Sequence, residues 1–82
     1  MYTSVVALNM VRIGHLYRCR IEPLANHISA YQLVLVAQPG QGGEETILED
    51  GTGRVAVFLG LQDAQSKAKS LRFSEKQIEL PE

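Results

Sequence analysis

The chain has 82 residues, a net charge of −1, a single cysteine, and 45% hydrophobic and 21% charged residues. This length allows one domain with one two-layer core, and the composition excludes disordered and membrane-spanning classes. The balanced charge argues against a dedicated, strongly basic nucleic-acid binder. So small a core gives only about 3 to 5 kcal/mol of net stability, and self-association is a common remedy.

The N-terminal segment favours a helix over residues 4–13. Ser4 can cap it, apolar side chains recur every three residues, and Gly14 follows where the helix would stop. The β-branched content leaves a strand as the alternative. We expect a broad buried apolar side that comprises Val5, Val6, Leu8, Met10, Val11, Ile13 and Leu16.

No positively charged segment precedes the first apolar run, which Asn9 and Arg12 interrupt. We therefore expect no export signal, no membrane association and a cytoplasmic location.

Two segments with strand periodicity come next. Residues 15–22 alternate, with Tyr17, Cys19 and Ile21 on one face and Arg18, Arg20 and Glu22 on the other. Residues 31–36 are apolar on both faces, which predicts a central strand.

A hairpin and a helix are predicted further along. Candidate strands 44–49 and 54–59 flank Asp50-Gly51-Thr52-Gly53, whose glycines allow the positive φ angles of a tight turn. A helix over 61–72 should bury its stripe of Leu61, Ala64, Ala68 and Leu71 against the sheet. The simplest assembly places this stripe on the strand face formed by Val55, Val57 and Leu59.

The alternating residues 76–80 can add a short edge strand. The predicted fold is therefore a single α+β domain, residues 1–82. It has an antiparallel β-meander of four to five strands, a C-terminal helix packed on one face and an N-terminal helix beside it.

The sequence offers no catalytic constellation, metal site or cofactor site. Cys19 falls in a strand pattern as a small buried apolar residue, and neither His15 nor His27 has a spacing that places it beside the thiol. Four acids gather around the predicted hairpin, and because strand residues alternate faces they indicate a solvated edge rather than a cation site. They are Glu44, Glu45, Glu49 and Asp50. The loop Gly40–Gly43 leads into a strand, whereas phosphate cradles lead into a helix.

The order of strands and helix over 31–71 resembles the small sheet-reading DNA-binding domains of phage integrases. This resemblance implies a nucleic-acid face to which Arg18, Arg20 and Arg54 contribute. The acids of the hairpin would repel phosphate on such a face.

A second resemblance is to short bacterial proteins of an uncharacterised domain family. It is carried by Tyr31-Gln32-Leu33, Asp50-Gly51-Thr52-Gly53 and the segment from Phe58 to Ala64. Gly60 departs from the pattern, because such proteins tend to carry a Ser or Thr cap there. The resemblance implies a fold and a bacterial cytoplasmic setting, and no activity.

The function expected from these observations is a small non-enzymatic interaction or regulatory module that forms a homodimer or binds a protein partner. Its surface would be an open sheet face or an edge strand. One helix cannot cover two apolar strand faces, Val34 with Val36 and Ala56 with Phe58. If the N-terminal helix covers them instead, the case for a dimer weakens.

Overall fold

The computed structural model describes residues 1–24, 29–41 and 44–81. Its helices are α1 (Ser4–Arg12) and α2 (Leu61–Ser70), and two short 3-10 turns are η1 (Pro39–Gln41) and η2 (Glu75–Gln77). The strands are β1 (Leu16–Pro23), β2 (Ala30–Ala37), β3 (Glu45–Ile47), β4 (Phe58–Leu59) and β5 (Ile78–Glu79). The predicted α+β class and the order of helices and strands are confirmed.

The N-terminal segment is a helix, and the alternative of a strand is excluded. Its cap is Thr3 rather than Ser4, because the Thr3 side chain accepts a hydrogen bond from the backbone N–H of Val6 at 3.3 Å. Gly14 follows the C-cap Ile13 with φ +81°, a left-handed conformation that glycine adopts without strain. The helix therefore ends where the sequence predicted.

β2 lies in the centre of the sheet, as its two apolar faces predicted. β1 pairs antiparallel with one of its edges, and β3 and β4 both pair antiparallel with the other. A bulge between Leu16 and Arg18 shifts the register of β1. Leu16 is consequently buried, and Tyr17 lies outside the core instead of sharing the buried face with Cys19 as expected.

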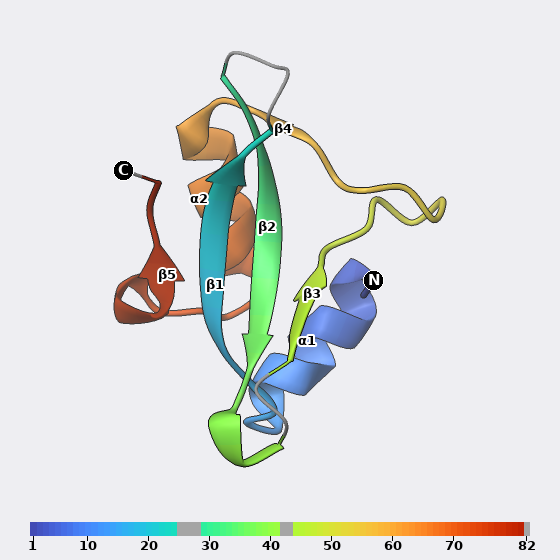
Figure 1. Cartoon of the computed structure of the whole chain (residues 1–82), viewed down its shortest axis with the longest axis vertical. Coiled ribbons are helices and arrows are strands. Elements are labelled where there is room, and N and C mark those ends of the chain that lie inside the picture. The colour runs from blue at the N-terminus through green and yellow to red at the C-terminus, as the bar shows by residue number, and fades with distance from the viewer. Residues whose placement is uncertain (25–28, 42–43, 82) are drawn as a thin grey trace.

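The predicted hairpin is only partly formed. Gly51 and Gly53 have φ +98° and +87°, and the Asp50 carboxylate accepts a hydrogen bond from the backbone N–H of Thr52 at 2.8 Å. The residues on the two sides of this turn form a single antiparallel bridge, between Glu49 and Val55. The chain then pairs with β2 again as β4. Residues 49–57 therefore form an excursion that projects from the edge of the sheet where β3 and β4 lie (Figure 1).

Residues 55–59 do not bury the predicted face of Val55, Val57 and Leu59, but the opposite face, which carries Ala56 and Phe58. Phe58 pairs with Tyr31 of β2 and packs against the core, and Ala56 is 7% exposed. Val57 and Leu59 are 52% and 77% exposed. Because side chains alternate along a strand, pairing with β2 in this register turns Phe58 inward and its neighbours outward.

The sheet is mixed rather than a purely antiparallel meander. The order is β3-β2-β1-β5, and β5 runs parallel to β1, with Cys19 opposite Ile78 and Arg20 opposite Glu79. The parallel direction is possible because α2 and η2 carry the chain back across the sheet before β5 begins.

Both helices cover the same face of the sheet (Figure 1). One cluster joins Ala7 of α1, Ala64 and Ala68 of α2, and the inward side chains of the two long strands. Those strand residues are Cys19, Ile21, Leu33 and Leu35, each at most 1% exposed. Val34 of β2 points the other way and does not belong to this cluster. Over residues 1–24, 29–41 and 44–81, the fold thus has two layers and one sheet face without a helix over it.

Enlarging an alanine of α2 should destabilise the protein, because Ala68 is fully buried against the sheet. We expect Ala68→Leu to lower the free energy of unfolding by about 1 to 3 kcal/mol, measured by urea denaturation. The control Gln62→Leu lies on the exposed side of α2 and should change it by less than about 0.5 kcal/mol. Equal effects of the two substitutions would contradict this packing.

Candidate functional site

The uncovered sheet face is the first candidate surface. Strand pairing places Arg18, Arg20 and Glu22 of β1 on it, beside Val36, Val34 and Gln32 of β2. β3 adds Glu45 and Ile47, β4 adds Leu59, and β5 adds Glu79. We call this set the open face.

Arg20 organises the open face. Two nitrogens of its guanidinium donate to the two carboxylate oxygens of Glu45 at 2.8 and 3.0 Å, and its Nε donates to Glu22 at 2.7 Å. Gln32 donates to the other oxygen of Glu22 at 3.4 Å. The bidentate ion pair between Arg20 and Glu45 joins β1 to β3 across β2, because β2 lies between these two strands in the sheet. Val34, which is opposite Arg20 in register, is only 4% exposed.

The ion pairs set the charge of this face. Hydrogen bonds from Arg20 hold the pKa of the Glu45 carboxyl below its usual value, because they favour the charged carboxylate. Arg18 lies 3.8 Å from Glu79. Two arginines and three glutamates therefore meet on the open face, and its net charge is slightly negative.

The structure brings together two of the three arginines predicted for a nucleic-acid face. Arg18 and Arg20 share the open face, where each forms an ion pair with a glutamate. Arg54 is exposed in the excursion of residues 49–57, outside the strands. The three positive charges do not form one patch on the sheet.

The apolar content of the open face is smaller than expected. Val36 and Ile47 are half-buried, and Leu59 is 77% exposed at one end of the face. The second predicted face, Ala56 with Phe58, packs into the core instead. The N-terminal helix does not cover Val34 and Val36, because it lies on the other side of the sheet.

The outer side of α1 is a second candidate surface that the sequence pattern did not reveal. Val5 and Ile13, expected in the buried side of this helix, are 70% and 74% exposed, and Val6 is 38% exposed. Ala7, on the side of the helix opposite Val5, is fully buried. With apolar residues on both sides of the helix, periodicity could not distinguish the covered side from the free one.

Cys19 behaves as the sequence predicted. It is fully buried, and burial raises the pKa of its thiol to about 12. A thiol that stays protonated at neutral pH is a poor nucleophile and a poor metal ligand. His15 precedes β1 and is half-buried, whereas His27 lies outside the described residues.

The acids of the predicted hairpin separate into different environments. Glu45 binds Arg20 on the open face, and the pKa of Asp50 is lowered because its carboxylate accepts hydrogen bonds from Thr52. Within residues 1–24, 29–41 and 44–81, no three His, Cys, Asp or Glu side chains are grouped as metal ligands would be.

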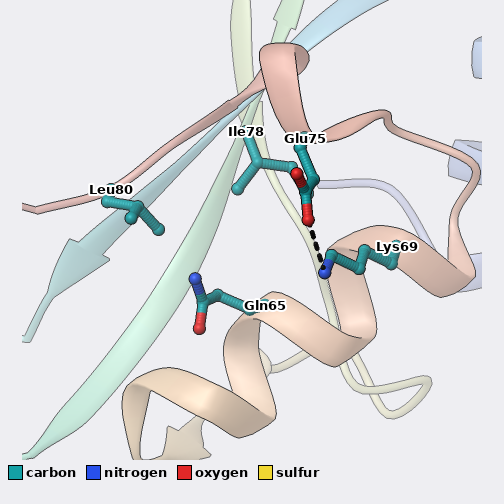
Figure 2. A pocket seen from close by; sticks show the side chains of 5 residues that line it. All are labelled: Gln65, Lys69, Glu75, Ile78 and Leu80. Atoms are coloured by element: carbon teal, nitrogen blue, oxygen red, sulfur yellow. Dashed lines mark hydrogen bonds and ion pairs between the residues drawn. The ribbon is translucent and has the colours of Figure 1, made fainter.

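A hollow of about 280 Å³ lies between α2 and the segment of η2 and β5 (Figure 2). Gln65 and Lys69 reach into it from α2, while Ile78 and Leu80 form its apolar wall. Lys69 donates to Glu75 across its rim at 3.3 Å. This hollow is slightly smaller than typical small-molecule pockets, which begin near 300 Å³.

Comparison of the chain with models of protein families, with curated proteins and with solved structures found no match. None of the helices in the described parts of the chain is long and apolar enough to cross a membrane.

Removing the Arg20 guanidinium should release the Glu45 carboxyl. We expect Arg20→Gln to raise the pKa of Glu45 toward its usual value, because the hydrogen bonds that favour its charged form are lost. A pH titration followed by the carboxyl carbon chemical shift measures this. Arg18→Gln is the matched control, because Arg18 pairs with Glu79 and should leave Glu45 unchanged. An unchanged pKa in the Arg20 variant would contradict the pairing.

Proposed function

We propose that this protein is a small non-enzymatic interaction module that acts as a homodimer. The proposal is supported by one observation above all: apolar side chains are exposed on surfaces that the fold leaves uncovered, on both sides of its two layers. Leu59 is exposed on the open face, and Val5 and Ile13 are exposed on α1. Exposed apolar patches on small proteins commonly mark surfaces for other proteins.

The sheet edges give less support to a strand-pairing partner. β5 has two residues and is followed closely by Pro81, and β1 ends at Pro23. Proline has no backbone N–H to donate to an added strand. At the other edge, the backbone N–H of Tyr2 donates to the C=O of Ile47 in β3, and the C=O of Tyr2 accepts from the N–H of Glu49.

Sheet-mediated nucleic-acid binding is the second candidate, because Arg18 and Arg20 share the open face. It has less support than self-association. Phosphate would have to displace glutamates already bound to these arginines, and the face would still carry more negative than positive charge.

The solution mass tests the proposal. Light scattering over a concentration series reaching about 1 mM detects dimers that are held by as little as about 4 kcal/mol. We expect a mass that rises with concentration from the 9.1 kDa of one chain to twice that value. Addition of duplex DNA at low salt should not change it. A mass of one chain at every concentration would contradict the proposal, and a gain of mass with DNA would favour the second candidate.

A further inference from the structure

The outer side of α1 carries a stripe whose layout is symmetric about its centre. At about 100° per residue, Val5, Asn9 and Ile13 project within about 80° of one another. Asn9 lies in the middle of this stripe, on the side of the helix opposite the fully buried Ala7. We call Val5, Asn9 and Ile13 the α1 stripe; Val6, which is 38% exposed, lies beside it.

We infer that the α1 stripe is the contact between two copies of this chain, with the two α1 helices antiparallel about a two-fold axis at Asn9. This inference rests on the proposed homodimer and assigns its surface. In this pairing Val5 meets Ile13 of the partner subunit, Ile13 meets the partner's Val5, and the two Asn9 amides face each other. A two-fold contact requires a self-complementary surface, and a stripe with apolar ends and a polar centre meets that requirement.

The charges at the two ends of α1 favour the same direction. Arg12 is exposed at the C-terminal end of the helix. At the N-terminal end, Ser4 lines a hollow of about 270 Å³ together with Glu49, Asp50 and Lys67, whose charges sum to one net negative charge. An antiparallel pair brings the arginine of each subunit toward this net negative end of the other, whereas a parallel pair would set the two arginines side by side.

The excursion of residues 49–57 lies near the N-terminal end of α1, where the N–H of Glu49 donates to the C=O of Tyr2. Val57 lines the same hollow as Ser4 and is 52% exposed, so another apolar side chain lies at the N-terminal end of α1. The helix itself is short, about 14 Å for its nine residues, so the contact is at the small end of specific interfaces. The dimer should therefore dissociate on dilution.

Two substitutions remove the apolar ends of the stripe without harming the helix. Ile13→Lys places a positive charge at the C-terminal end of α1, and Val5→Glu places a negative charge at its N-terminal end, and both suit the helix dipole. Each change occurs twice in the dimer, so we expect each variant alone to associate at least about tenfold more weakly, measured by light scattering. Leu59→Lys is the matched control, because Leu59 is 77% exposed on the open face and Ile13 is 74% exposed.

A mixture of the two variants tests the antiparallel direction. In a mixed dimer the two new charges face each other with opposite signs, and the native Ile13 of one chain meets the native Val5 of the other. We therefore expect the mixture to regain at least half of the dimer lost by either variant alone. Circular dichroism of each variant confirms that α1 is intact.

The possible outcomes separate this inference from the proposed function. A wild-type protein that is monomeric at every concentration contradicts both. A wild-type dimer that survives Ile13→Lys and Val5→Glu but is lost with Leu59→Lys contradicts the α1 contact and moves self-association to the open face. A mixture no more dimeric than its components contradicts the antiparallel direction.

Discussion

The packing of alanines on β1 and β2 is the constraint on which the rest of the structure depends. Ala64 and Ala68 have no side chain beyond Cβ, so α2 can approach the strands closely and seal Cys19 and Leu33 completely. Ala7 lets α1 join the same cluster. Because both helices pack on this one face, no helix of the described residues covers the opposite face of the sheet.

The one-sided packing gives the two sides of the sheet different chemistry. The covered side is a buried apolar core, and the Cys19 thiol in it is held protonated by burial, which raises its pKa to about 12. The open face is held in order by Arg20, which binds carboxylates from its own strand and from β3. An ordered polar face is well suited to remain in water, whereas the apolar α1 stripe is not. This difference is the reason why the proposed self-association is placed on α1 rather than on the open face.

Local pattern predicted most of the elements and the core stripe of α2, because Ala64, Ala68 and Leu71 recur at helical spacing.

Three features of the fold could not be predicted from local pattern, because they depend on which segments pack together. β4 returns to β2 instead of completing a hairpin, and this choice of partner decides that Phe58 is buried and Leu59 exposed. The bulge at Tyr17 breaks a regular alternation. The free side of α1 could not be recognised, because Val5 and Ile13 look as apolar as residues that are buried. Among the candidate site residues, the alternation of residues 15–22 predicted that Arg18 and Arg20 share a face, but it could not predict their glutamate partners from other strands.

Oxidative cross-linking at Asn9 tests the central claim most directly. Helices packed 8–10 Å apart bring the Cα atoms of two facing residues to about 4 to 5 Å, which a disulfide can span. Asn9→Cys should therefore form a covalent dimer under mild oxidation, detected on a non-reducing gel, while the buried Cys19 stays unreactive. Ser66→Cys, exposed on α2, should remain monomeric under the same conditions. Equal cross-linking of the two variants, or none at Asn9→Cys, would contradict a two-fold axis at this residue.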